Sequence, residues 1–539
     1  MKSLFINLIF IAFLPLNTHA QLWEHFYGKP DSYEFSNFMI ETYDKGILTG
    51  GTTSSILNYD SHTWLVKLDR NGDSLWSKTL KSNYPNRVHS IVNTADGGIA
   101  GCGSIYIDSS AWLSKPFAFK LDACGELEWC TYFETDRILS WAQSIVVTDD
   151  NSFLITLNSY GDYDTENTFL AKLDTNGWQL WAKPVINPDI YTDVANPYSE
   201  TLLETKAGNY LLSGKGFWRH NPADSVYWLR PFYALYDEAG NEQWITPFGI
   251  ADSLLGRGYG CTEMENGHFL CAARRYFYSG SLQHGFIIEL DGDGNTLNYR
   301  SVEPGEIDEN CHSMFFLQIE QLGDALVLAM PYLPDPNSED YPSVLSLGMD
   351  VFNEELPLLN LRAFEDKWGM QHIITKTNDN KVISIKTQQD QSAASYTDLY
   401  LLKMNTMLAT DSIRPDNSIY DSLCPHPISH GEVFFDNWHI IPGVNELSNP
   451  SQNPQLNKLT FRVQPNPGKD RISLQFDKIN GSGQIVINIY STHGSLLINL
   501  PNYRPGSSSI DVSSLPKGIY VIQVLKQGYA PGTQKFIKY

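Results

Sequence analysis

The chain is short of positive charge and of long apolar segments. Its 539 residues include 38 Lys and Arg against 61 Asp and Glu, which gives a formal net charge of −23 at neutral pH. A surface this acidic repels nucleic acid, so we expect no nucleic-acid partner. Beyond residue 20 no stretch is apolar enough to cross a bilayer, so we also expect no transmembrane segment.

Motifs of common catalytic and cofactor sites are also missing from the sequence. It contains no GxSxG, no HExxH, no phosphate-binding loop and no CxxC pair with zinc-like spacing. Acidic residues are plentiful, but neighbours in a loop do not provide the two facing carboxyl groups that a glycosidase needs. We therefore predict no catalytic residue and no cofactor.

The seven cysteines do not form the dense framework of a small secreted domain. Cys261 and Cys271 flank a turn at Asn266-Gly267, so we predict that they pair across a β-hairpin. Because the count is odd, at least one thiol is free or pairs elsewhere.

The first twenty residues, MKSLFINLIFIAFLPLNTHA, have the pattern of a secretory signal peptide. An early lysine precedes an apolar run from Leu4 to Leu16, and small residues stand at Thr18 and Ala20. We expect cleavage after Ala20, which leaves Gln21 as the mature N-terminus.

A twelve-residue pattern recurs through the first three quarters of the chain. It reads LVKLDRNGDSLW at 65–76 and returns at 117–129, 169–181 and 233–244. In each copy an alternating strand leads into Asp, Gly follows three residues later, and Trp follows four residues after the Gly. Asp and Gly at these positions are typical of a tight turn between two strands. Each copy therefore predicts a β-hairpin.

A second turn precedes each of these hairpins, so that every repeat reads as four strands. From Asp44 to Asp379 the repeats are spaced about 56 residues apart, a period that is typical of a β-propeller. The segment QLWEHFYG at 21–28 resembles the last strand of a repeat, and the seventh repeat lacks that strand. We predict an all-β chain in which residues 21–410 form a seven-bladed β-propeller, closed by the N-terminal strand.

Two loops of this propeller are candidate binding sites. Asp291, Asp293 and Asn295 alternate as calcium ligands do, although ordinary turn chemistry explains the same residues. In the segment KGFWRHNPADSVYWLRP, aromatic and cationic groups gather that suit stacking on a sugar or a peptide. We expect Trp218, Arg219 and His220 to be exposed there and to contact a ligand, with the following Tyr-Trp pair in the next strand.

The last quarter of the chain changes in composition. Residues 411–458 are rich in Pro, Asn and Ser, which predicts a linker with one ordered strand at EVFFD. Residues 459–539 alternate short strands with Gly, Pro and Asn turns, which predicts a small Ig-like β-sandwich.

Short motifs in this last domain occur in a fixed order. They include these residues: Pro465, Asn466, Pro467, Gly494, Leu515, Pro516, Gly518 and Tyr520. Together they resemble the type A C-terminal sorting domain of the type IX secretion system of Bacteroidetes. The resemblance implies recognition by that secretion machinery, passage through the periplasm, and release or attachment at the cell surface. The alternative is an ordinary Ig-like adhesion or carbohydrate-binding domain.

These observations favour a secreted or surface-bound protein that binds or scaffolds without catalysis, with an extracellular glycan or protein as its partner. Two alternatives stay open: a secreted enzyme that degrades polysaccharide or peptide, and an adhesin or gliding-associated surface protein.

Overall fold

The structure, a computed structural model, describes residues 21–539 apart from these segments: 56–60, 108–112, 136–138, 161–165, 187–193, 220–226, 250–254, 277–282, 303–312, 315–316, 323–324, 334–343, 351–357, 363–371, 390–396, 436–437, 442–456, 459–460, 477–484, 492–495, 505–508, 527–528 and 531. In the described part every regular element is a β-strand, which confirms the predicted all-β class. No helix formed by the described residues is long and apolar enough to cross a membrane. The predicted signal peptide lies outside the described residues.

Up to residue 302 the strands that follow β1 form consecutive antiparallel groups of four, each in chain order. The first group is β2 (Ser32–Glu41), β3 (Ile47–Ser55), β4 (Ser61–Leu68) and β5 (Ser74–Lys81). The second is β6 (Asn86–Asn93), β7 (Ile99–Tyr106), β8 (Ser114–Leu121) and β9 (Leu127–Phe133). The third is β10 (Leu139–Val147), β11 (Phe153–Tyr160), β12 (Glu166–Leu173) and β13 (Gln179–Pro184). The fourth is β14 (Val194–Glu204), β15 (Tyr210–Arg219), β16 (Tyr227–Tyr236) and β17 (Glu242–Pro247), and the fifth is β18 (Leu255–Glu263), β19 (Phe269–Tyr276), β20 (Gln283–Leu290) and β21 (Thr296–Val302).

The remaining two groups depart slightly from this order. In one, β24 (Ala325–Leu333) pairs with β22 (Ser313–Met314), β23 (Gln318–Leu322) and β25 (Val344–Asp350), and β25 pairs with β26 (Leu358–Arg362). In the other, β27 (His372–Thr377), β28 (Lys381–Gln389) and β29 (Thr397–Met404) are completed by the N-terminal strand β1 (Glu24–Tyr27), which pairs antiparallel with β29.

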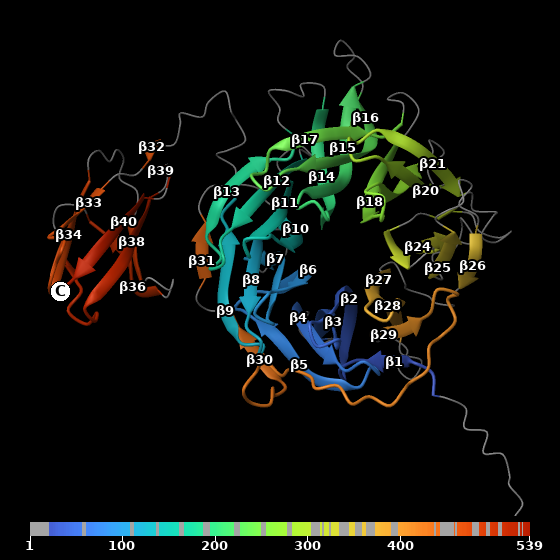
Figure 1. Cartoon of the computed structure of the whole chain (residues 1–539), viewed down its shortest axis with the longest axis horizontal. Coiled ribbons are helices and arrows are strands. Elements are labelled where there is room, and N and C mark those ends of the chain that lie inside the picture. The colour runs from blue at the N-terminus through green and yellow to red at the C-terminus, as the bar shows by residue number, and fades with distance from the viewer. Residues whose placement is uncertain are drawn as a thin grey trace, which may run out of the picture.

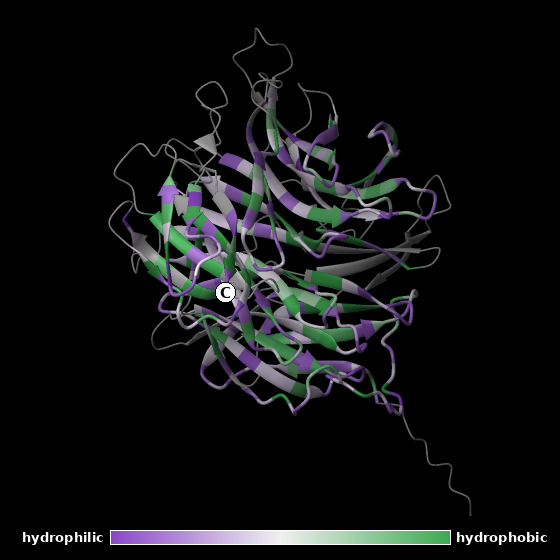
Figure 2. Ribbon diagram, turned by 60° about the vertical axis from the view of Figure 1, so that its left-hand side comes forward, coloured by the Kyte–Doolittle hydropathy of each residue, from purple (hydrophilic) through white to green (hydrophobic). Residues whose placement is uncertain are grey.

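The groups follow one another around a circle, with first strands such as β2, β6 and β10 toward its centre (Figure 1). The last group lies against the first: the Ser36 amide donates to the Thr387 hydroxyl at 3.0 Å, and Thr397 donates to the Glu34 carbonyl at 3.0 Å. Hydrophobic residues run along the strands, and hydrophilic residues mark many of the turns (Figure 2). The number of blades stays a prediction.

The recurring Asp builds a tight turn between the third and fourth strands of a group. One carboxylate oxygen of Asp69 accepts hydrogen bonds from the amides of Asn71 and Asp73, at 2.8 and 2.9 Å. The same pair of bonds recurs at Asp122, Asp174 and Asp291. Gly72 has a φ of 89°, which a residue with a side chain rarely adopts. The turn therefore selects both the Asp and the Gly of the repeat.

The recurring Trp joins one group to the next. The Trp129 indole donates to the Thr175 carbonyl at 3.0 Å, and Trp244 donates to the Gly292 carbonyl at 3.0 Å. Each ring covers the glycine of that next turn, because a Cβ placed on Gly177 would lie 2.5 Å from the Trp129 ring. In these copies the dodecamer thus encodes a turn and the indole that covers the following turn, whereas Trp76 of the first copy donates to the Asp421 carboxylate at 3.0 Å.

A recurring Lys stabilises the other turn of the repeat. Lys67 of β4 forms an ion pair with Asp44 at 2.8 Å, and Thr42 donates to the same Asp44 oxygen at 2.6 Å. Corresponding ion pairs join Lys120 to Asp96, Lys172 to Asp150, and Lys403 to Asp379. Since the lysine lies on the third strand and the aspartate between the first two, each pair fastens three strands together.

Residues 411–441, which we call the strap, differ from the predicted linker. β30 (Gly431–Phe434) adds a parallel strand to β5, and β31 (Trp438–Ile441) adds one to β9. Phe435 is 2% exposed and contacts the rings of Phe117 and Phe119. β30 lies at the one strand expected in this linker, EVFFD. β31 and the buried Phe435 go beyond that expectation, because a few apolar side chains fill gaps between neighbouring sheets despite a loop-like composition.

The C-terminal residues form a separate body beside the ring (Figure 1). One sheet contains β33 (Phe461–Gln464), β34 (Arg471–Phe476) and β37 (Ile510–Asp511). The other contains β36 (Leu496–Tyr503), β35 (Ile485–Ser491), β38 (Gly518–Lys526) and β40 (Gly532–Lys538). A short pair joins β32 (Asn457–Lys458) to β39 (Tyr529–Ala530). Side chains from both sheets, including Ile472 and Ile487, share one buried core.

Candidate functional site

The predicted ligand loop begins at the end of β15. Trp218 is 5% exposed and packs beside Phe232 of β16, so the expectation that its indole is exposed is wrong. Its position in the strand turns the ring into the sheet interface rather than toward solvent. The side chain of Arg219 and all of His220 lie outside the described residues, so their ligand role stays a prediction.

The predicted calcium residues form the turn between β20 and β21. The Asp291 carboxylate accepts hydrogen bonds from the amides of Asp293 and Asn295 and from the Asn295 side chain, at 3.0, 2.8 and 3.0 Å. These bonds lower the pKa of Asp291. The carboxylate oxygens are thus engaged by the turn, and calcium binding there stays a prediction.

Cys261 and Cys271 face each other in the β18–β19 hairpin and form a disulfide, with their Cα atoms 4.1 Å apart. A second disulfide, between Cys124 and Cys424, joins residues 300 positions apart and was not predicted. Nothing in the local sequence of either cysteine indicates the other.

A cluster of charged side chains, which we call the Glu200 cluster, lies where the third, fourth and fifth groups meet. Glu200 and Arg257 come from the innermost strands β14 and β18, and their side chains form an ion pair at 2.9 Å. Glu166 of β12 and Lys215 of β15 form a second ion pair at 2.8 Å. These side chains are 8–24% exposed, so the cluster is largely withdrawn from water.

Aromatic rings border this cluster. Trp141 of β10 stacks on Tyr160 with ring centroids 5.3 Å apart and lies 5.7 Å from the Tyr198 ring. Lys215 and Arg257 both lie over the Tyr198 ring, at 5.0 and 4.9 Å from its centroid. Rings beside charged hydrogen-bonding groups are the usual lining of sites that bind polar ligands.

Burial changes the ionisation of the Glu200 cluster. It raises the pKa of Glu200 to about 7, although Arg257 and Lys215 act in the opposite direction and Glu166 adds to the rise. Burial also lowers the pKa of Lys215 against the effect of Glu166. Shifted pKa values are common at functional sites and also occur in structural ion-pair networks.

Sequence reasoning missed the Glu200 cluster because its members are far apart in the chain and belong to no motif. One signal was available: Glu200 and Arg257 are charged residues in the first strands of the fourth and fifth groups, and the first strands lie nearest the centre of a propeller. Their convergence depends on how three groups pack together, which no short sequence pattern reports.

The sorting-domain motifs converge on the last strand, β40. The Asn466 side chain donates to the Lys535 carbonyl at 2.7 Å and accepts from the Ile537 amide at 2.9 Å. The Tyr520 hydroxyl donates to the Pro516 carbonyl at 2.5 Å, and its ring stacks on Phe536. Leu515 is buried nearby, and Gly494 lies outside the described residues. These motifs thus hold the terminal strand in one place.

The C-terminal domain matches a known protein family. Residues 462–539 match the family described as the secretion system C-terminal sorting domain. No curated protein matches the chain.

Solved structures resemble the chain weakly. A protein of unknown function from Dyadobacter fermentans is 11% identical, with a TM-score of 0.40, over 60% of this chain and 96% of that one. The full extracellular region of plexin A4 is 9% identical, with a TM-score of 0.43, over 96% of this chain and 67% of that one. An α-L-arabinofuranosidase from Lactobacillus brevis is 10% identical, with a TM-score of 0.30, over 51% of this chain and 94% of that one. These values carry no argument about activity.

The family match and the clustered motifs agree on the same residues. Residues 462–539 are therefore a C-terminal sorting domain of the type IX secretion system, and the protein is one that this system delivers to the cell surface or the extracellular space.

Proposed function

We propose that the exported part of this protein is a seven-bladed β-propeller that binds a polar extracellular ligand without catalysis. The blades are the first five groups, the group from β22 to β26, and the group that β1 completes. Trp23, just before β1, supports closure of the ring because its indole donates to the Arg70 carbonyl of the first group at 2.8 Å.

The observation that carries the binding proposal is the Glu200 cluster with its aromatic border. Charged groups from β12, β14, β15 and β18 meet beside Trp141 and Tyr198. Saccharides are recognised by this combination, since ring faces stack on their C–H surfaces while charged side chains bond their hydroxyl groups. A glycan is therefore the ligand class that we assign to the site.

The ion pairs favour binding over hydrolysis. A glycosidase needs one carboxyl group as an acid and a second as a nucleophile or base. Here Glu166 and Glu200 each face a cation, Lys215 and Arg257, at 2.8 and 2.9 Å. Both carboxyl groups are thus engaged by cations of the chain itself rather than left to face each other across a sugar.

A glycan-array screen of the mature chain, residues 21–539, tests this function. We expect saturable binding to a subset of glycans without release of product. Arg257→Met should weaken binding at least about tenfold, whereas Glu126→Gln, which changes an exposed carboxylate of another ion pair, should not. Release of product would establish the enzyme, and binding that is unchanged in Arg257→Met would exclude this site.

A further inference from the structure

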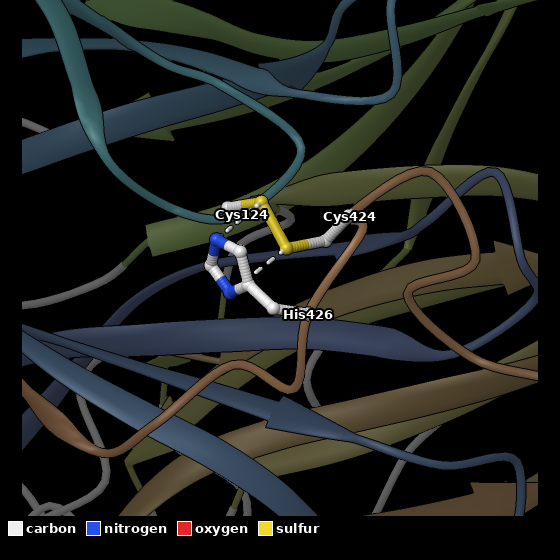
Figure 3. Close-up of side chains that lie close together, drawn as sticks. All are labelled: Cys124, Cys424 and His426. Atoms are coloured by element: carbon white, nitrogen blue, oxygen red, sulfur yellow. Dashed lines mark hydrogen bonds between the residues drawn. A yellow bond between two sulfur atoms is a disulfide. The ribbon is translucent and has the colours of Figure 1, made fainter.

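Cys124, Cys424 and His426 meet at one point between the ring and the strap (Figure 3). Cys124 lies in the Asp122 turn of the second group, and the other two side chains belong to the strap. The cysteines form a disulfide, and the His426 imidazole lies beside both sulfurs: Nε2 is 3.8 Å from the Cys124 sulfur, and Nδ1 is 3.7 Å from the Cys424 sulfur.

These three side chains are the only group of three His, Cys, Asp or Glu residues in the described part of the chain whose ligand atoms lie close enough to hold a metal ion. Their donor atoms all lie within 4.8 Å of one another. Two thiolates and an imidazole prefer zinc and other soft ions. With zinc–sulfur and zinc–nitrogen bonds of about 2.3 and 2.0 Å, a nitrogen and a sulfur on one ion lie about 3.5 Å apart, close to the observed nitrogen–sulfur distances of 3.8 and 3.7 Å. The two sulfurs, which are bonded to each other in the disulfide, have to separate before an ion can enter.

The ring side of this site is held in place independently of the disulfide. The Asp122 carboxylate accepts hydrogen bonds from the amides of Cys124 and Glu126, at 2.8 and 2.9 Å. The turn that presents Cys124 is therefore fixed by bonds within the turn, as at Asp69, Asp174 and Asp291.

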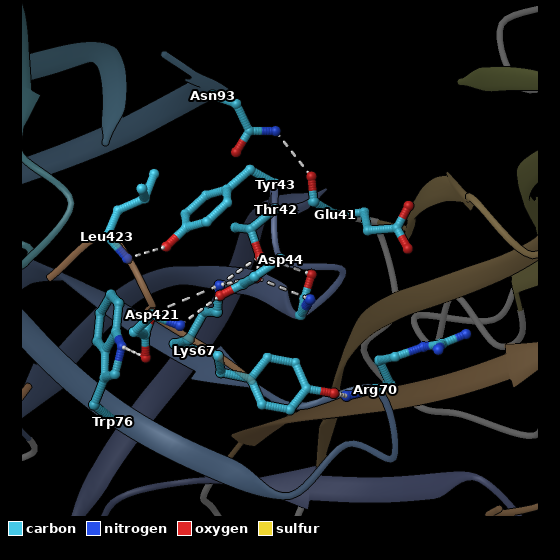
Figure 4. A network of polar contacts seen from close by, with 12 residues as sticks. Glu41, Thr42, Tyr43, Asp44, Lys67, Arg70, Trp76, Asn93, Asp421 and Leu423 are labelled. Carbon is cyan, nitrogen blue, oxygen red and sulfur yellow. Dashed lines mark hydrogen bonds and ion pairs between the residues drawn. The ribbon is translucent and has the colours of Figure 1, made fainter. Parts of the chain in front are cut away.

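The strap side is also held independently, as Figure 4 shows. The Cys424 amide donates to the Asp421 carbonyl at 3.0 Å. Asp421 in turn donates its amide to Asp44 at 2.9 Å and accepts from the Trp76 indole at 3.0 Å. Together with the pairing of β30 on β5, these contacts keep Cys424 beside Cys124 when the sulfur–sulfur bond is open.

We propose that Cys124, Cys424 and His426 form a cross-link between the ring and the strap, here called the latch. It has two states, a disulfide and a zinc site. A dithiol reduces the disulfide: the two cysteines gain two electrons and two protons, and the dithiol becomes a disulfide. One zinc ion then displaces both thiol protons and takes the His426 imidazole as its third ligand. Because His426 is exposed, water completes the coordination.

Metal titration of the mature chain tests the latch. We expect the protein reduced with a phosphine to bind one zinc ion per chain, measured by competition with a chromophoric chelator, and the oxidised protein to lack this site. Cobalt in place of zinc should give thiolate-to-metal charge-transfer absorption. His426→Ala should weaken zinc binding at least about tenfold, and Cys424→Ser should abolish it.

Matched variants separate this site from other cysteines. The double variant Cys261→Ser with Cys271→Ser removes the hairpin disulfide and should leave zinc binding unchanged. His426→Ala changes an exposed side chain, so its folding is expected to be normal and can be checked from the unfolding midpoint of the oxidised protein. No zinc binding by the reduced wild-type chain, or equal binding by Cys424→Ser, would overturn the two-state latch.

Discussion

The Trp23 indole donates a hydrogen bond to the carbonyl oxygen of Arg70, 47 residues later, at 2.8 Å. The same ring lies against Gly72, whose φ is 89°. Trp129 and Trp244 make the corresponding contacts with the turns that follow them. The N-terminal segment therefore supplies to the first group the contact that the third, fourth and fifth groups receive from Trp129, Trp181 and Trp244.

Replacement of Trp23 by alanine should destabilise the ring strongly. Trp23 is 1% exposed, and loss of a buried tryptophan typically lowers the free energy of unfolding by about 3–5 kcal/mol. Urea unfolding of the mature chain measures the change. The control is Leu180→Ala, which alters a side chain that is 54% exposed and should cost less than about 0.5 kcal/mol. Equal effects of the two variants would contradict this role.

Alanine substitutions at two glycines distinguish the cost of backbone strain from the cost of a clash with the neighbouring indole. Gly177 and Gly267 have φ values of 79° and 81°, so alanine at either site is strained by about 1 kcal/mol. At Gly177 the new Cβ would also lie 2.5 Å from Trp129, whereas nothing lies within 4 Å at Gly267. We expect Gly177→Ala to lower the unfolding midpoint clearly more than Gly267→Ala. Similar losses would indicate that the indole does not restrict this turn.

The repeat could be predicted from the sequence because its chemistry is local. Asp69 and Gly72 build their turn from bonds within five residues, and the same residues reappear in every legible copy. The pairing of Cys261 with Cys271 lies across one hairpin and follows from the same local geometry.

The pairing of the strap with the ring and the Glu200 cluster could not be predicted because both depend on distant contacts. Cys424 meets Cys124 across 300 residues, and Glu200 meets Arg257 only when two groups pack side by side. Trp218 shows the opposite error: a loop-like sequence around it suggested exposure, but its place in β15 buries it.

The Lys67–Asp44 ion pair should tolerate removal of both charges better than removal of one. Both side chains are at most 3% exposed, and Thr42 and Asp421 also bond the Asp44 carboxylate (Figure 4). Lys67→Met leaves a buried carboxylate without its cation, a change that costs about 3–5 kcal/mol in comparable pairs. Adding Asp44→Asn should recover a large part of that loss.

Urea unfolding of the two single variants and the double variant measures this coupling. The corresponding pair Lys172 and Asp150 is the control, because Asp150 is 48% exposed and water can replace its partner. We expect a smaller loss for Lys172→Met than for Lys67→Met. Strictly additive effects at Lys67 and Asp44 would show that the two charges do not interact.

Glu200 should make the stability of the ring depend on pH between about 4 and 7. Its pKa is raised to about 7 in the folded chain by burial, whereas a carboxyl group in an unfolded chain ionises near about 4.3. Between these values the folded state binds more protons than the unfolded state, so the stabilisation from the protonated Glu200 is present below pH 4 and is lost as the pH rises toward 7.

In Glu200→Gln the side chain no longer titrates, so the decline of stability over this range should be smaller than in the wild type. Unfolding midpoints at several pH values measure the difference, and Glu126→Gln, at an exposed carboxylate, is the control. Parallel profiles for Glu200→Gln and the wild type would show that the pKa of Glu200 does not change on folding.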